Sequence, residues 1–262
     1  MKTKLRKPII ALPKGRMVLE ARWVFAKNGY TSLDLDRELF RIECLKRDFN
    51  EVGINGKRVV TIDEKLNDNY YEGERADFII PKSSDLPAYV DEGIADIGIV
   101  GKDSKDEYAL EGQGRGRGYI SAPVSDGFEF PKMRFAIIGR KGKEEYQRVC
   151  EMMQENKDII VATSYPKQAK AFLLRNYPDY RGEFIDMMTL DGEVELAVRV
   201  GRANIGFELV SSGKSVIRNG LCSYIPEEKA EPIPVLQIIN RGARNNNQEL
   251  AELFEKIEKG GE

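Results

Sequence analysis

The sequence predicts an α/β protein, in which short apolar strands alternate with amphipathic helices. Two observations carry this prediction. Strand-like apolar runs are followed several times by helix-spaced apolar residues, and the hydrophobic fraction of 41% is that of a globular protein. Such alternation is typical of a mostly parallel sheet with helices on its faces. The 262 residues suffice for one large domain or two modest ones.

The first half of the chain opens with this pattern. An apolar run at residues 8–12 is followed by a helix-spaced pattern that ends near Gly29. Further strands are expected at residues 78–80 and 97–100, with a helix over residues 86–92 between them.

The second half repeats the alternation. Strands are expected at residues 134–138, 159–162 and 204–210. Helices are expected at residues 144–155, 167–176, 194–200 and 214–219, and an amphipathic helix within residues 245–262.

Two regions interrupt the alternation of strands and helices. Polar residues 37–74 predict hairpins or a small excursion. The glycine-rich segment 111–118 could cradle an anion, but its composition favours a flexible loop or an interdomain crossover about twofold.

The composition excludes several classes of protein. The chain has no histidine, so catalysis by a Ser-His-Asp or Cys-His system and every His-containing zinc site are excluded. The 41 Lys and Arg nearly balance the 43 Asp and Glu, which argues against nucleic-acid binding. Cys44, Cys150 and Cys222 are too widely spaced to indicate a disulfide framework or a metal site. No apolar stretch is long enough to span a membrane, so we expect a soluble, cytoplasmic protein.

The segment 207–216 is the most informative candidate site. An apolar strand delivers Glu208, and small hydroxyl and glycine residues then lead into a short helix. Amides at a helix N-terminus carry partial positive charge, so this turn suits a phosphate monoester. Glu208 suits ribose hydroxyls or a hydrated cation. A plain turn with serine N-caps fits equally well. The Walker A motif is excluded, because its first glycine would have to stand at position 208.

Two further segments are candidates for ligand binding. Lys14-Gly15-Arg16 follows a strand and opens a helix, where cations are mildly unfavourable, so this segment favours an anionic ligand over a solvated helix start. Glycines within and after the strand of segment 95–103 indicate close approach of a ligand or, equally, tight packing.

Taken together, these segments resemble the ATP phosphoribosyltransferase family. The collinear blocks that carry the resemblance are Ala11-Leu12-Pro13-Lys14-Gly15-Arg16, segment 85–103, Ala162-Thr163-Ser164-Tyr165-Pro166, segment 194–197 and segment 208–221. They span nearly the whole chain in the order of the family.

The resemblance implies a two-domain architecture like that of type II periplasmic binding proteins, with the substrate cleft between the lobes. We expect residues 1–112 and 222–262 to form one lobe. Residues 113–221 would form the second lobe, which carries the phosphoribosyl pyrophosphate loop. The chain ends at the helix after Asn245, so we expect the short form, without the regulatory domain of the long form.

The resemblance also implies the reaction, in which N1 of ATP displaces pyrophosphate from phosphoribosyl pyrophosphate with Mg²⁺. Glu208 and Lys14 are then the expected catalytic residues, with Glu208 on the ribose hydroxyls. The expected phosphate ligands are Ser211, Ser212, Gly213, Lys214 and Ser215. The expected ligands of ATP or another anionic group are Lys14, Gly15, Arg16, Lys82 and Asp96. A metal ion would be held through the substrate pyrophosphate.

This sequence departs from the family pattern at several positions. Glu208 replaces the usual aspartate of the loop, Lys214 is an added cation, Lys82 replaces an arginine, and Glu193 replaces a serine. These changes leave two alternatives open: a paralogue that uses another nucleobase or nucleotide, and a non-catalytic bilobed binding or regulatory subunit. The resemblance further implies a homo-oligomer, or a hetero-oligomer with a regulatory subunit similar to histidyl-tRNA synthetase.

Overall fold

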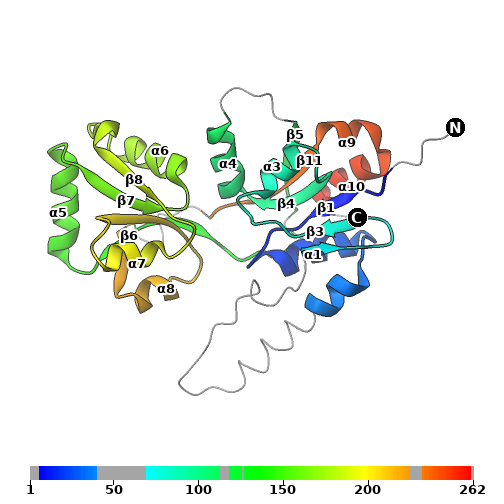
Figure 1. Cartoon of the computed structure of the whole chain (residues 1–262), viewed down its shortest axis with the longest axis horizontal. Helices are drawn as coiled ribbons and strands as arrows, with labels where there is room; N and C mark the ends of the chain where they lie inside the picture. The colour runs from blue at the N-terminus through cyan, green and yellow to red at the C-terminus, as the bar shows by residue number, and fades with distance from the viewer. Residues whose placement is uncertain (1–5, 40–68, 113–117, 126, 225–231, 261–262) are drawn as a thin grey trace, which may run out of the picture. The chain divides into compact units, whose positions relative to one another are not determined.

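The computed structural model describes residues 6–39, 69–112, 118–125, 127–224 and 232–260. The chain divides into two compact units, drawn in Figure 1. The first comprises Met1–Tyr108, Gly114–Pro131 and Pro234–Glu262, and the second comprises Ala109–Gln113 and Lys132–Ile233. Each unit combines helices with a sheet of its own, which confirms the predicted α/β class.

The sheet of the first unit has six strands in the order β2-β3-β1-β4-β11-β5. The strands are β1 (Ile9–Ala11), β2 (Tyr70–Tyr71), β3 (Asp77–Ile79), β4 (Ile97–Gly101), β5 (Tyr119–Pro123) and β11 (Val235–Asn240). The helices are α1 (Val18–Lys27), α3 (Leu86–Asp91), α9 (Arg241–Asn246) and α10 (Gln248–Lys259), and α4 (Lys102–Glu111) begins in this unit. Residues 33–39 are helical as well.

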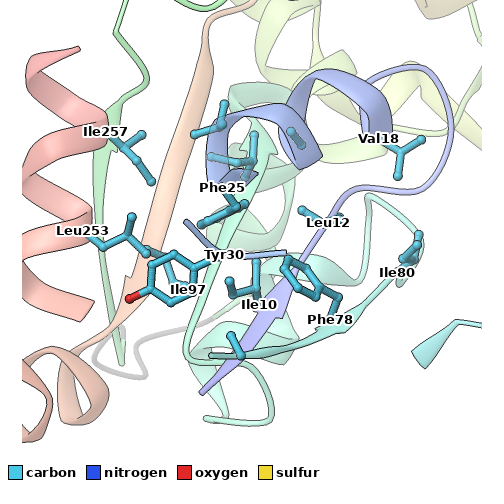
Figure 2. Close-up of a cluster of buried hydrophobic side chains, with 14 of the residues drawn as sticks. Ile10, Leu12, Val18, Phe25, Tyr30, Phe78, Ile80, Ile97, Leu253 and Ile257 are labelled. Carbon is cyan, nitrogen blue, oxygen red and sulfur yellow. The ribbon is translucent and has the colours of Figure 1, made fainter. Parts of the chain in front are cut away.

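Apolar residues cover both faces of this sheet. Phe25 of α1 and Leu253 of α10 pack with Ile10 and Ile97 in one buried cluster, part of which is drawn in Figure 2. Since successive strand residues point to opposite faces, Ala11 lies on the other face, in a cluster with α3. The helices therefore hold β1 and β4 at the centre of a packed sheet.

The second unit has a five-stranded sheet in the order β10-β6-β9-β7-β8. The strands are β6 (Arg134–Arg140), β7 (Ile159–Thr163), β8 (Ile185–Thr189), β9 (Ile205–Val210) and β10 (Leu221–Ser223). The helices are α5 (Lys143–Gln154), α6 (Pro166–Asn176), α7 (Val194–Arg199) and α8 (Lys214–Arg218), with a 3₁₀ turn η2 (Gly182–Phe184). One buried cluster contains side chains of α5 and α6, and another contains side chains of α7 and α8.

Both sheets are mixed, so the predicted mostly parallel arrangement is wrong for three of the five strand pairs in the first sheet and two of the four in the second. β1 is parallel to β3 and β4, and β7 is parallel to β8 and β9. The remaining pairs are antiparallel. Helical crossovers give parallel neighbours, whereas β6 and β11 begin just after the chain passes from one unit to the other.

Residues 109–112, 114–131 and 222–233 belong to the other unit than the one given by the lobe division expected from the sequence. β5 belongs to the first unit because it pairs with β11, and β10 belongs to the second because it pairs with β6. Most of the polar interruption at 37–74, residues 113–117 of the glycine-rich segment and Cys44 lie outside the described residues. Among the helices that are described, none is both long enough and apolar enough to cross a membrane.

Candidate functional site

A turn between β9 and α8 forms the first candidate site. β9 is buried through Phe207, becomes half-buried at Glu208 and ends at Val210. Gly213 lies in the left-handed region at φ 65° and directly precedes α8, a backbone conformation that favours glycine. Ser212 and Lys214 are exposed, so the turn presents its hydroxyls and its cation to solvent.

The backbone of this turn is available to a ligand. Within the part of the chain that the structure describes, none of the five amides from Ser211 to Ser215 donates a hydrogen bond. The carbonyl oxygens of Gly213 and Ser215 accept bonds from α8 and its end, from Ile217 and Asn219 respectively, at 3.0 Å. Unpaired amides that precede and open a helix attract anions, so the turn has the donors that a phosphate requires.

Glu208 lies in β9, the strand that leads into the turn. Its Oε1 accepts a hydrogen bond from the amide of Leu209 at 2.8 Å. This bond to its own neighbour fixes one carboxylate oxygen beside the backbone. In the sheet, Glu208 lies opposite Ala136 of β6.

Several polar residues meet at this edge of the second sheet. Because β7, β8 and β9 are parallel, their carboxyl ends lie together, and Thr163 stands opposite both Thr189 and Phe207. β6 runs the other way, so its first residue, Arg134, lies at the same edge, opposite Val210. Arg134 donates a hydrogen bond from Nη1 to the carbonyl oxygen of Ser211 at 3.4 Å.

The structure adds two residues that were not predicted for this site. Arg134 contacts the turn, and Glu195, in the first turn of α7, accepts a hydrogen bond from the hydroxyl of Ser215. Glu195 is visible in the sequence as an acidic residue that opens a short helix. Arg134 could be found only from the antiparallel register of β6 and β9.

The second candidate site lies in the first unit, where the loops after β1 and β3 are joined by hydrogen bonds. The amide of Lys14 donates to the carbonyl oxygen of Pro81 at 3.0 Å, and Ser83 Oγ donates to the carbonyl oxygen of Lys14 at 3.1 Å. The structure thereby brings the Lys14 loop next to Lys82. Gly15 has φ 96°, which allows the sharp turn into α1.

The cations of this site differ in their surroundings. Lys14 is half-buried and Arg16 is exposed. Among the described residues, neither has an ion-pair partner, so both positive charges are available to an anion. Lys82 is exposed and already interacts with another group.

Asp96 is not brought together with these cations. It precedes β4, at the amino end of that strand, whereas Lys14 and Lys82 follow the carboxyl ends of β1 and β3. Its carboxylate accepts bonds from the amide of Ile9 and from Arg6, each at 2.8 Å. Burial raises the pKa of Asp96 above its ordinary value, although these two bonds oppose the shift.

The glycines of segment 95–103 are explained by packing. A Cβ atom on Gly98 would lie 2.8 Å from the carbonyl oxygen of Ala11 and 3.1 Å from Leu86 Cδ2. One on Gly101 would lie 2.0 Å from Asp103 Oδ1. The structure therefore supports tight packing, and not close approach of a ligand, as the reason for these glycines.

Metal ligands are sparse in both units. Among the described residues, no three His, Cys, Asp or Glu side chains gather as a metal site. Cys150 and Cys222, the two cysteines that the structure describes, are free thiols.

Comparison with known proteins gives one consistent result. Residues 82–259 match the family described as ATP phosphoribosyltransferase. An ATP phosphoribosyltransferase of Caldicellulosiruptor saccharolyticus is 29% identical over 255 residues, which cover 95% of this chain and 97% of the relative. One of Streptococcus thermophilus is 30% identical over 181 residues, which cover 69% of this chain and 72% of the relative.

Solved structures agree with the fold. The ATP phosphoribosyl transferase (HisG:HisZ) complex of Thermotoga maritima contains a chain that matches with a TM-score of 0.57 at 16% identity. The match covers 97% of this chain and 99% of that one. At this identity the likeness extends to the fold alone.

Proposed function

The chain belongs to the ATP phosphoribosyltransferase family, and from this premise we propose which of its residues hold each substrate. The reaction of the family transfers the 5-phosphoribosyl group of phosphoribosyl pyrophosphate to N1 of ATP and releases pyrophosphate. It is the first step of histidine biosynthesis, and it makes this protein a glycosyltransferase with two polyanionic substrates.

The phosphoribosyl group is assigned to the β9–α8 turn. The observation that carries this assignment is the run of amides from Ser211 to Ser215 that donate no hydrogen bond within the described residues, directly after β9, the strand that carries Glu208. These amides, with the hydroxyls of Ser211 and Ser212 and the cation of Lys214, would hold the 5-phosphate. Glu208 would accept hydrogen bonds from the ribose hydroxyls.

The anionic part of ATP or of the pyrophosphate is assigned to the Lys14 loop. The absence of ion-pair partners for Lys14 and Arg16 among the described residues supports this, as does the hydrogen-bonded neighbour loop that carries Lys82. Gly15 allows a ligand to approach the backbone. Asp96 stays a prediction from the resemblance alone, because its carboxylate is already bonded to Arg6 and Ile9.

The chemistry of the reaction suits a chain without histidine. Adenine N1 has a free lone pair at neutral pH, so its attack needs no strong general base. The protein must instead align two polyanions and compensate their charge. In this account Glu208 orients the ribose, and Lys14 lies beside charge that develops on the departing pyrophosphate.

The family implies Mg²⁺, and the residues fit an ion that is bound mainly by substrate. Magnesium sites commonly use one or two carboxylates together with substrate phosphates and water. The described residues offer no three-ligand cluster, and Glu208 is the candidate for a water-mediated contact. When bound, the ion neutralises charge on the pyrophosphate leaving group.

We further propose a cytoplasmic enzyme that assembles with other subunits. ATP and phosphoribosyl pyrophosphate are metabolites of the cell interior. The Thermotoga maritima structure is a complex of two different proteins, HisG and HisZ. A hetero-oligomer with a subunit similar to histidyl-tRNA synthetase is therefore proposed here, alongside a homo-oligomer of the catalytic chain.

Product formation tests the proposal. The full chain, alone and with such a partner, is incubated with ATP, phosphoribosyl pyrophosphate and Mg²⁺, and the product is identified by mass spectrometry. We expect phosphoribosyl-ATP and pyrophosphate in equal amounts. Failure to form this product with either preparation would overturn the assignment of the two substrate sites.

A further inference from the structure

One hydrogen bond connects the two helices on one face of the second sheet. The hydroxyl of Ser215, in the first turn of α8, donates to Oε1 of Glu195, in the first turn of α7. Behind this bond, Val194 of α7 and Val216 of α8 belong to the same buried cluster. The bond therefore fixes the start of α8 against the start of α7, next to the turn assigned to the 5-phosphate.

The bond limits what Ser215 can do for a phosphate. A serine hydroxyl has a single proton to donate. While that proton is shared with Glu195, the hydroxyl cannot also donate it to a phosphate oxygen. The amide of Ser215 makes no hydrogen bond with any described residue, so this group can still be offered to a ligand.

The negative charge of Glu195 also argues against a contact between the Ser215 hydroxyl and the phosphate. If Ser215 were a phosphate ligand through its hydroxyl, the carboxylate and the phosphate would compete for one proton at close range, and like charges would repel. A carboxylate at this position is instead explained by its effect on the backbone, because it holds the first turn of α8 in place.

We propose that Glu195 is a positioning residue of the phosphoribosyl site. By holding the hydroxyl of Ser215, it braces α8 against α7 and keeps the amides of the turn directed at the 5-phosphate. Ser215 then contributes its amide and not its hydroxyl to the substrate. This inference rests on the proposed function, since it takes the turn at 211–215 to be the phosphate site.

The two possible roles of Ser215 predict opposite effects of removing Glu195. If the Ser215–Glu195 bond braces α8 against α7, Glu195→Ala releases the turn and weakens binding of phosphoribosyl pyrophosphate. If the hydroxyl is a phosphate ligand, Glu195→Ala frees its proton, removes a repelling charge and strengthens binding. Glu195→Gln keeps an oxygen acceptor without the charge, so the brace survives in this variant.

The experiment measures binding of phosphoribosyl pyrophosphate with Mg²⁺ to the full chain by calorimetry, together with steady-state kinetics. Glu195→Ala and Ser215→Ala should each weaken binding about tenfold, the effect of losing one hydrogen bond to a charged group. The double variant should be no weaker than either single variant, because both remove the same bond. Glu195→Gln should stay near wild type. In Glu195→Ala and Glu195→Gln, kcat and the KM for ATP should change less than about twofold.

Glu144→Ala is the matched control. Glu144 also lies in the first turn of a helix of the second unit, is exposed, and has no ion-pair partner among the described residues. Its removal should leave binding of phosphoribosyl pyrophosphate unchanged, which separates loss of a brace from loss of one negative charge.

Unchanged or tighter binding in Glu195→Ala overturns the inference, and so do additive effects in the double variant. A lowered kcat and a raised KM for ATP in the same variant, with no recovery in Glu195→Gln, would show a general structural role and overturn it too. If Glu195→Ala does not fold, Ser215→Ala and Glu195→Gln decide the question. Failure of the wild-type chain to bind phosphoribosyl pyrophosphate refutes the proposed function as well, whereas normal wild-type binding with an unaffected Glu195→Ala refutes the brace alone.

Discussion

Arg134 Nη1 lies 3.4 Å from the carbonyl oxygen of Ser211 and donates a hydrogen bond to it. This contact joins the first residue of β6 to the first residue of the proposed phosphate turn. It places a guanidinium at the edge of the sheet to which the 5-phosphate is assigned. A cation that holds the carbonyl in this position leaves the amides of the turn free to face the ligand.

Loss of this contact should weaken binding of phosphoribosyl pyrophosphate. Arg134→Ala is expected to raise the KM for phosphoribosyl pyrophosphate about tenfold, because a charge-assisted bond to the turn and a nearby positive charge are both lost. Arg134→Lys should recover only part of the effect, since an ammonium group lacks the planar donors of guanidinium. Steady-state kinetics with varied phosphoribosyl pyrophosphate measure both variants. An unchanged KM in Arg134→Ala would remove Arg134 from the site.

Replacement of Glu208 tests the ribose assignment. Two hydrogen bonds from ribose hydroxyls to one carboxylate should together contribute about a hundredfold to kcat/KM, and Glu208→Ala should lose most of this factor. The side chain is half-buried and accepts a bond from the amide of the adjacent Leu209, so the melting temperature should change little. Kinetics and thermal unfolding are measured on the same preparation. Wild-type kcat/KM in this variant would refute the assigned role.

Glu193 offers a stability test near α7. It is the N-cap residue of this helix, has φ 54° and ψ 28°, and makes no capping bond with its side chain. A residue other than glycine in this left-handed region is strained, so Glu193→Gly should stabilise the protein by about 0.5–1 kcal/mol. Glu193→Ala removes the same charge but keeps Cβ, and it should give no such gain. Urea unfolding measures both, and equal stabilities of the two variants would contradict the strain argument.

Gly98 tests the packing of the first sheet. A Cβ atom at this position would lie 2.8 Å from a backbone oxygen of β1, closer than normal contact permits. Gly98→Ala should therefore lower the free energy of unfolding by about 1–3 kcal/mol. The measurement is chemical denaturation of the full chain. An unchanged free energy of unfolding would show that β1 and β4 separate easily.

Stability should fall at high pH. Burial is the main cause that raises the pKa values of Tyr30, Tyr108, Tyr180 and Tyr224 to about 12. In the unfolded chain tyrosine has a pKa of about 10, so the fold favours the neutral phenols. Their contribution is complete below pH of about 10 and is lost as the pH rises through about 12. Absorbance at the phenolate band should show these four tyrosines losing their protons near pH 12. Titration of every tyrosine near a pKa of about 10 would contradict the burial.

Much of the fold follows from the sequence, and the exceptions have physical causes. Helices α1, α5 and α6 lie close to their predicted ranges, because their apolar residues repeat with the helical period. β5, β10 and β11 were not predicted, since their pairing partners are distant in sequence and short strands carry little periodicity. The mixed direction of both sheets likewise depends on how the chain returns between units.

Some features of the candidate sites could likewise be predicted from the sequence, and others could not. The glycine and serine residues around Gly213 predict a turn with available amides, and the structure has this turn at the end of β9. The Ser215–Glu195 bond depends on the packing of two helices, which no local pattern encodes. Asp96 could have been separated from Lys14 by strand direction alone, because a residue that precedes a parallel strand lies at the opposite edge from one that follows its neighbour.

Hydrogen exchange at the β9–α8 turn tests the central claim most directly, because it requires neither turnover nor a partner subunit. The full chain is exchanged in deuterated buffer with and without phosphoribosyl pyrophosphate and Mg²⁺, and peptides that cover residues 206–218 are analysed by mass spectrometry. The amides from Ser211 to Ser215, which donate no hydrogen bond within the described residues, should become protected when the substrate binds. Protection elsewhere in the chain, with these amides exchanging as before, would contradict the assignment of the 5-phosphate to this turn.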